Sequence, residues 1–272
     1  MEAGMEGAHV QNLSKFGLMN ALIGIVNSGA ENEADTVIAA YLLAHFNTLN
    51  GLSIYDIAEA CFTTRQSVRR FCQRIGLDNF RAFKKEQLAM EYYGDYHPVA
   101  NYPEVLAREL GLMAQEVNEV ALPYLDRFCD EIHRADRCVF LVSDIYSAAC
   151  LEFQKQLILY GKMVRIVSNN FQNNLVLGSL TERDLVITVS ISGRWARELL
   201  ELIEATSAWR VLITAMHDDD LISEFDEVFH VSRTDKPQVK TAYHLFAIPY
   251  LLEIGQKRYR DRYLPHPLHA PA

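Results

Sequence analysis

Five hydrogen-bonding side chains between residues 64 and 69 are spaced so that one helix would present them together. Arginine can hydrogen-bond to the edge of guanine, and glutamine to that of adenine. Arg65, Gln66 and Arg69 are therefore candidates for reading bases in a DNA major groove. Thr64 and Ser67, with the free N–H groups of a helix start, suit backbone phosphates. The pattern predicts a base-reading helix over residues 64–75.

Basic side chains continue beyond this helix start. Residues 64–85 contain seven Lys and Arg against a single acid, although the chain of 272 residues has a formal net charge of −9. A basic segment on an acidic chain is typical of a phosphate-binding surface, and a solvated helix face is the alternative. Arg70, at the margin of the outward face, is a further DNA candidate. We assign the more distant basic residues Arg74, Arg81, Lys84 and Lys85 to phosphates.

A helix-turn-helix is expected to position these side chains. Ser53 can cap one short helix, with Asp56 three positions later as in a capping box, and Thr64 can cap the second. Gly76 is placed to end the second helix. The inward positions of that helix are apolar and recur at helical spacing: Val68, Phe71 and Ile75. Two short capped helices joined by a tight turn form a helix-turn-helix.

The chain changes character at Arg137, where short apolar strands begin to alternate with helices. This alternation predicts a doubly wound α/β domain with a five-stranded parallel sheet, so the fold class is α + α/β with an all-α N-terminal domain. A connecting helix is expected at 104–133, with Pro123 as a kink or boundary. Strands are predicted at 138–143, 164–168, 184–190, 210–216 and 227–232, and helices at 146–161, 195–208 and 238–260.

The domain boundaries follow from these segments and from the breaker-rich stretch near residue 93. We expect a helix-turn-helix domain at 1–92 and a linker with its connecting helix at 93–133. An α/β domain is expected at 134–262, followed by a flexible tail at 263–272.

The N-terminal motif resembles the RpiR/MurR family of bacterial regulators over about 35 residues. The matching runs are Leu52-Ser53-Ile54 to Ala58, Thr64 through Val68-Arg69-Arg70-Phe71-Cys72-Gln73-Arg74-Ile75-Gly76, and Asn79-Phe80-Arg81-Ala82-Phe83-Lys84. One position departs, because the family usually has glycine in the turn where this chain has Phe62. We therefore expect a turn built without easy access to positive φ.

The resemblance implies a sugar isomerase (SIS) domain after the helix-turn-helix, and residues 137–260 look like one. Two loops would hold the phosphate of a ligand there. Each follows a strand and opens a helix, so N–H groups and the helix dipole favour an anion. The candidate effector-binding residues are Ser143 and Ser147 in the first loop, and Ser190, Ser192, Gly193 and Trp195 in the second.

Both loops depart from the family pattern. Trp195 stands where SIS domains usually place a threonine, and Ser143 and Ile145 replace two glycines of the first loop. Asp144 would also repel a phosphate bound nearby. A sugar phosphate, a non-phosphorylated or cationic effector, and no effector at all therefore remain open.

The function expected from these features is sequence-specific DNA binding by a transcription regulator whose SIS-like domain dimerises and senses a metabolite. A homodimer or homotetramer on double-stranded DNA is the expected assembly. The alternatives are a sugar-phosphate isomerase, for which no acid–base set is evident, and a dimerisation module without effector.

No cofactor and no metal site are expected, since His217 followed by three aspartates reads more simply as a solvated loop. Five scattered cysteines suit a reducing cytoplasm, and no membrane partner is expected, because no apolar run reaches the roughly 18 residues of a membrane span.

Overall fold

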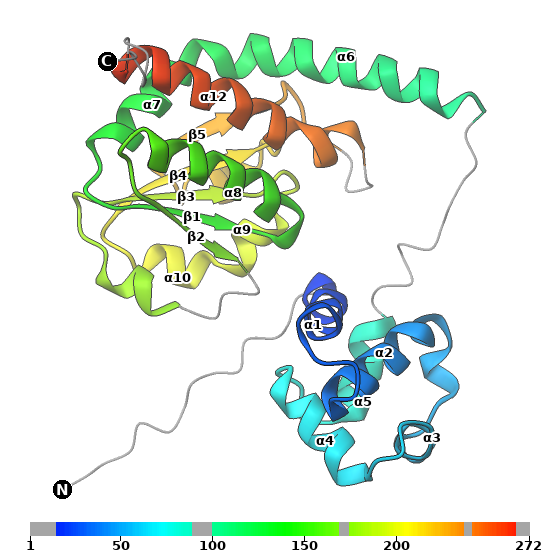
Figure 1. Cartoon of the computed structure of the whole chain (residues 1–272). Coiled ribbons are helices and arrows are strands. Elements are labelled where there is room, and N and C mark those ends of the chain that lie inside the picture. Colours follow the sequence, from blue (N-terminus) through cyan, green and yellow to red (C-terminus); the bar gives the residue numbers. More distant parts are fainter. Residues whose placement is uncertain (1–14, 89–99, 169–173, 237–240, 265–272) are drawn as a thin grey trace, which may run out of the picture. The chain divides into compact units, whose positions relative to one another are not determined.

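The structure is a computed structural model that describes residues 15–88, 100–168, 174–236 and 241–264 (Figure 1). The chain divides into two compact units, residues 1–98 and 99–272. Among the described helices, none combines the length and the apolar composition needed to cross a bilayer.

The first unit is helical throughout its described part. It comprises α1 (Lys15–Ser28), α2 (Ala34–Ala44), a short 3₁₀ segment (Phe46–Gly51), α3 (Ile54–Ala60), α4 (Arg65–Arg74) and α5 (Phe80–Leu88). Helices this short gain most of their stability from tertiary packing. The inward residues Val68, Phe71 and Ile75 of α4 are buried, as predicted, together with Cys72. They join one apolar core with Leu22 and other residues of the preceding helices.

The second unit contains a five-stranded parallel sheet, as the sequence predicted. Its strands are β1 (Cys138–Val142), β2 (Val164–Ser168), β3 (Leu185–Val189), β4 (Trp209–Thr214) and β5 (Glu227–His230). They are arranged in the order β2-β1-β3-β4-β5, and every pair is parallel. All residues of β1 and β3 are buried, which agrees with strands that are covered on both faces.

Helices form a layer on each face of this sheet (Figure 1). One layer contains α6 (Tyr102–Ala121), α7 (Leu125–Arg134), α8 (Asp144–Leu159) and α12 (Ile248–Tyr263), which share a core with alternate strand residues such as Phe140. The other contains α9 (Arg194–Glu198), α10 (Leu200–Glu204) and α11 (Asp219–Ile222), which pack on the opposite strand positions, including Leu141. Two apolar layers around one sheet define the doubly wound fold.

The predicted connecting helix is divided as expected at Pro123. A 3₁₀ turn at Leu122–Tyr124 separates α6 from α7. Both helices contribute to the core of the second unit, through Val117 of α6 and Phe128 of α7 among others.

Two of the predicted helices differ from the structure. The helix expected at 195–208 is two short helices, because Leu199 leaves helical geometry (φ −105°, ψ 1°) and is buried in the core. Residues 238–240 of the helix expected at 238–260 lie outside the described residues, and the described part contains a π-helical turn, Tyr243–Ala247, before α12. Pro249 lies at the start of α12 and has no N–H to bond back to the preceding turn, which explains the altered turn.

All five cysteines are buried and unpaired. Burial raises the pKa of each thiol, to about 11 for Cys72 and to about 12 for Cys138. These side chains therefore behave as small apolar core residues at neutral pH.

Candidate functional site

The start of α3 is fixed by a capping box, as predicted. The Ser53 hydroxyl accepts a hydrogen bond from the Asp56 backbone N–H at 3.3 Å, and the Ser53 N–H donates to the Asp56 carboxylate at 2.6 Å. The hydrogen bond from the Ser53 backbone is the main reason that the pKa of Asp56 is lowered. Two of the free N–H groups at this helix start are thereby satisfied.

The turn between α3 and α4 corrects an expectation drawn from the sequence. Phe62 adopts a φ of +49°, so the turn does use the left-handed conformation although it has no glycine. The Thr63 N–H donates to the Ala58 carbonyl at 2.8 Å, which closes the turn across the end of α3. The Phe62 side chain is 99% exposed and forms no part of the core. The closed backbone turn, and not the side chain, therefore holds this conformation.

The start of α4 is capped by Thr64, as predicted. Its hydroxyl accepts from the Ser67 N–H at 3.1 Å and lies 2.9 Å from the Ser67 hydroxyl. The end of the helix is closed by Gly76, which has a φ of +83°, while the Leu77 N–H donates to the Cys72 carbonyl at 2.9 Å. This is the Schellman arrangement that a C′ glycine permits.

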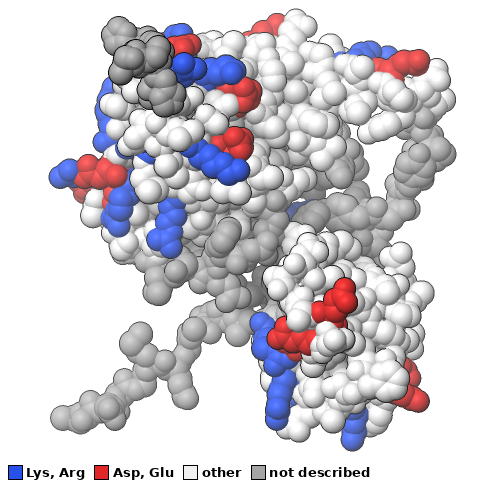
Figure 2. Space-filling model, viewed as in Figure 1, with Lys and Arg blue, Asp and Glu red and all other residues white. Residues whose placement is uncertain are grey.

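The outward face of α4 carries the side chains proposed to contact DNA. Arg65, Gln66, Arg69 and Arg70 are exposed, and Ser67 is half-buried at the margin. Figure 2 shows basic side chains along the part of this unit that α4 forms, with acidic side chains beside them. The structure thus places the four long polar side chains on one exposed helix surface.

The more distant basic candidates have other partners in the structure. Arg74 forms an ion pair with Asp35 of α2. The Lys84 ammonium donates to the Asn50 carbonyl at 2.9 Å and lies 5.5 Å from the centroid of the Phe80 ring. The side chain of Lys85 lies outside the described residues. Phosphate binding by these three residues therefore stays a prediction.

The effector candidates lie at the topological switch point of the sheet. The helix after β1 leads to β2 on one side, whereas β3 lies on the other side of β1. Ligands of open α/β sheets bind at the carboxyl ends of the strands at this point. Ser143 directly follows β1 and Ser147 lies near the start of α8, while Ser190 and Gly193 lie in the loop that follows the neighbouring strand β3.

The loop after β3 is tightly organised. The buried Ser190 hydroxyl accepts from the Ala196 N–H at 3.2 Å, so Ser190 satisfies one of the free N–H groups at the start of α9. Gly193 has a φ of +70°, and a Cβ there would lie 2.9 Å from the Leu221 side chain. Only glycine fits this position without strain. Ser192 is half-buried, and the indole N–H of Trp195 is buried with no hydrogen-bond partner in the described part of the chain.

The loop after β1 has a simpler structure. Ser143 precedes α8 without forming a side-chain cap, and the Ser147 hydroxyl donates to the Ser143 carbonyl at 3.5 Å. The side chain of Asp144 lies outside the described residues. Effector binding by the candidates of both loops remains a prediction that the geometry permits.

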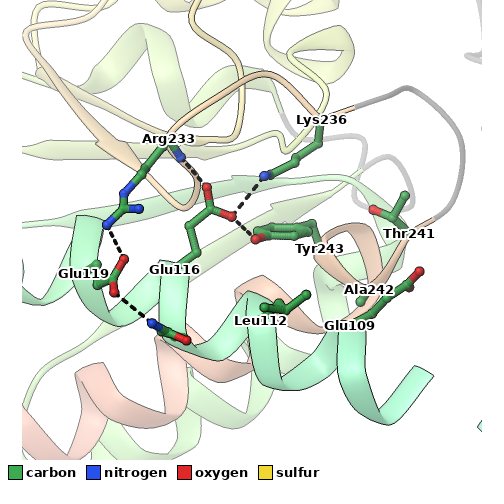
Figure 3. Close-up of a pocket in the computed structure, with 10 residues that line it drawn as sticks. Glu109, Leu112, Glu116, Glu119, Arg233, Lys236, Thr241, Ala242 and Tyr243 are labelled. Atoms are coloured by element: carbon green, nitrogen blue, oxygen red, sulfur yellow. Dashed lines mark hydrogen bonds and ion pairs between the residues drawn. The ribbon is translucent and has the colours of Figure 1, made fainter. Parts of the chain in front are cut away.

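Sequence reasoning missed a cavity of about 490 Å³ between α6 and the segment that follows β5 (Figure 3). The Glu116 carboxylate projects from α6 and accepts hydrogen bonds from the Lys236 ammonium at 2.9 Å, the Arg233 N–H at 2.7 Å and the Tyr243 hydroxyl. The Arg233 guanidinium is paired in turn with Glu119. Both basic side chains are therefore already engaged by carboxylates. Residues more than a hundred positions apart form this network, which no local pattern could predict.

The acidic segment after β4 has ordinary structural roles in the described chain. The His217 ring stacks on His230 with centroids 4.2 Å apart, and its Nδ1 lies 3.4 Å from the Asp235 carboxylate. Asp218 caps α11 and pairs with Arg197. Burial lowers the pKa of His230, which favours its neutral form.

Taken together, a capped helix-turn-helix and a doubly wound α/β unit define the two-domain architecture of this chain. Residues 19–93 match the helix-turn-helix domain of the rpiR family, so the chain carries an rpiR-family domain in its N-terminal unit. The C-terminal unit is a doubly wound α/β domain with a five-stranded parallel sheet.

Three known proteins are similar to the chain. The HTH-type transcriptional regulator GlvR of Bacillus subtilis (strain 168) is 26% identical over 165 residues, which span 60% of this chain and 62% of that protein. The structure of Vibrio vulnificus NanR in complex with ManNAc-6P has 18% identity and a TM-score of 0.50, and covers 90% of this chain and 92% of that one. The sugar isomerase domain of an RpiR transcription factor from Sphaerobacter thermophilus has 16% identity and a TM-score of 0.47, and covers 60% and 94%. The NanR likeness shows the shared fold.

Proposed function

We propose that the chain is a sequence-specific DNA-binding transcription regulator whose C-terminal domain dimerises and senses a small metabolite. The observation that carries the proposal is the start of α4, where Arg65, Gln66 and Arg69 are exposed at the N-terminal end of a capped helix. The first turns of such a helix meet base edges when it lies in the major groove. GlvR, named as a transcriptional regulator, supports this function.

The assembly that this function requires is at least a homodimer. Two helix-turn-helix units related by a two-fold axis would bind a near-palindromic operator. The proposal includes a cytoplasmic setting, which suits the five unpaired cysteines.

The metabolite is proposed to bind between the loops after β1 and β3. NanR of Vibrio vulnificus is described in complex with ManNAc-6P, so sugar phosphates are the first class to test. The indole N–H of Trp195, which is buried and has no hydrogen-bond partner among the described residues, adds a donor to this region. Buried donors without a partner are costly, so a ligand oxygen would be a favourable acceptor.

We propose binding without catalysis at this site. Aldose–ketose isomerisation needs a general base placed at the reacting carbons. No such acid–base set is evident in the sequence. The loops also differ from the family pattern, since Trp195 replaces the usual threonine, and Ser143 and Ile145 replace glycines.

DNA recognition is tested by measuring the affinity of the full chain for the DNA upstream of its own gene. Wild type, Arg65→Ala and Arg70→Ala would be compared at two salt concentrations. Arg65→Ala is expected to cost about 1–3 kcal/mol on the preferred sequence alone, whereas Arg70→Ala weakens binding to all sequences and reduces the salt dependence. Arg108→Ala, an exposed arginine of α6, is the matched control. A wild-type chain without sequence preference contradicts the proposal.

Effector binding is tested by thermal unfolding with hexose phosphates, including ManNAc-6P, and with free sugars and inorganic phosphate as controls. A ligand that binds the folded state must raise the unfolding temperature. Ser192→Ala, whose side chain lies in the loop after β3, is expected to reduce the shift. If no compound in the panel shifts the transition, a dimerisation module without effector is favoured.

A further inference from the structure

The first residue of α4 is in direct contact with a tyrosine of α3. The Arg65 Nη1 donates a hydrogen bond to the Tyr55 hydroxyl at 2.7 Å. The Arg65 Cζ lies 4.6 Å from the centroid of the Tyr55 ring, within the range of a cation–π contact. Tyr55 is 61% exposed, so the pair is accessible on the surface.

The backbone positions that bring the two side chains together are both fixed. Tyr55 is the second residue of α3, which the capping box of Ser53 and Asp56 starts at a defined point. Arg65 directly follows Thr64, the cap of α4, and the turn between the helices is closed by the backbone hydrogen bond to Ala58. The contact therefore joins the two helices of the motif across a turn whose backbone is fixed by a hydrogen bond.

The other outward arginines of α4 differ from Arg65. Arg69 and Arg70 have no ion pair or hydrogen bond from their guanidinium groups within the described residues, and Arg74 is paired with an acid on its own unit. A free arginine loses much rotamer entropy when it docks in one orientation. A neutral hydroxyl and a ring face restrict Arg65 without neutralising its charge.

We propose that Tyr55 is a positioning residue that sets base specificity by holding the Arg65 guanidinium ready for a base edge. The inference rests on the proposed DNA-binding function and adds a second residue, on the other helix of the motif. The Tyr55 hydroxyl accepts a hydrogen bond from Arg65, so its own proton can still be donated to a DNA phosphate. Direct phosphate binding by Tyr55 is therefore the alternative role that the test must distinguish.

The test uses the full chain and the DNA sequence that it selects from a random duplex pool. Affinities would be measured for wild type, Tyr55→Phe, Arg65→Ala and the double variant. Each is tested on the selected site and on versions with single base pairs replaced. Tyr55→Phe keeps the ring but removes the hydroxyl, and its fold is checked by thermal unfolding. Tyr124→Phe, at an exposed tyrosine of the second unit, is the control.

Replacing one base pair of the selected site lowers the affinity of wild type, and Arg65→Ala should abolish this effect at one position. At that position, and at no other, Tyr55→Phe is expected to reduce the ratio of the two affinities about fivefold. It should leave the salt dependence unchanged and have no effect in the Arg65→Ala background. A loss that is uniform across sequences, an effect that adds to Arg65→Ala, or tighter binding by Tyr55→Phe overturns the positioning role. If wild type selects no sequence, the proposed function fails and the inference fails with it.

Discussion

Phe62, which stands where the rpiR-family pattern usually has glycine, has an unfavourable backbone conformation in the structure. A non-glycine residue in the left-handed region costs about 1–2 kcal/mol. The side chain is exposed and contributes no burial that would offset this strain. The turn is therefore held by its neighbours, through the backbone bond from Thr63 to Ala58.

Phe62→Gly is expected to stabilise the helix-turn-helix by about 0.5–1 kcal/mol, because relief of strain exceeds the greater entropy of glycine in the unfolded chain. Hydrogen exchange of amides in α3 and α4 of the full chain would measure the change. Phe62→Ala keeps the Cβ and should show no such gain. Equal stabilisation by both variants would mean that φ strain is not the cause.

A second prediction for single residues concerns Gly193, and Gly161 serves as its control position. Both have positive φ, but a Cβ at Gly193 would crowd Leu221, whereas no atom lies within 4 Å of a Cβ at Gly161. Gly161→Ala is expected to cost about 1 kcal/mol through strain, and Gly193→Ala about 2–3 kcal/mol through strain and overpacking. Urea denaturation checks both, and equal losses would argue against crowding at the β3 loop.

At the scale of elements, the amino ends of the strands are tied together by arginine–aspartate pairs. Asp184, just before β3, accepts from the Arg137 guanidinium at 2.6 and 3.1 Å and from the Thr181 N–H at 2.7 Å. Arg210 and Asp226 form a similar pair at β4 and β5. These pairs lie at the amino ends of the strands, whereas the switch-point loops lie at the carboxyl ends. They therefore stabilise the sheet and leave the carboxyl ends available for a ligand.

The Asp184 pair makes stability depend on pH. Its hydrogen bonds to Arg137 lower the pKa of Asp184 to about 2, against about 4 in an unfolded chain. A carboxyl with a lowered pKa stabilises the fold above the unfolded value, and this stability is lost as pH falls towards 2. Because Arg137 is half-exposed, Asp184→Asn should cost about 1–2 kcal/mol at pH 7.

The difference in the free energy of unfolding between Asp184→Asn and wild type should shrink as the pH falls from about 4 to about 2. Tryptophan fluorescence during urea unfolding reports this, since both tryptophans, Trp195 and Trp209, lie in the second unit. Asp136→Asn removes the exposed pair with Arg183 and should have little effect at any pH. A difference that stays constant with pH would contradict the assignment.

At the scale of the whole molecule, the apolar cores of the two units share no residue. Phe71→Ala is expected to destabilise the N-terminal unit by about 3–5 kcal/mol, while tryptophan-detected unfolding of the second unit is unchanged. Circular dichroism, which reports the helices of both units, should then show two transitions. Phe140→Ala should destabilise the second unit and leave the unfolding transition of the N-terminal unit unchanged. If either variant shifts both transitions, the two cores do not unfold independently.

The features predicted correctly from the sequence are those with local causes. Ser53 and Thr64 start helices, and Gly76 closes one, through hydrogen bonds between residues a few positions apart. The apolar strand runs need only burial on both faces. The break at Leu199 could not be predicted, because it follows from packing in the core. The same holds for the Glu116 network and for the Tyr55–Arg65 contact, which depend on distant segments or on side-chain geometry.

The burial of all five cysteines has a practical consequence for measuring the distance between the two units. Their thiols are shielded and their raised pKa values keep them protonated, so they react slowly with maleimides. A cysteine introduced at an exposed position of each unit would then be the rapidly labelled site in an otherwise native chain. Paired fluorophores or spin labels would report the distance between the units before and after DNA or a metabolite is added.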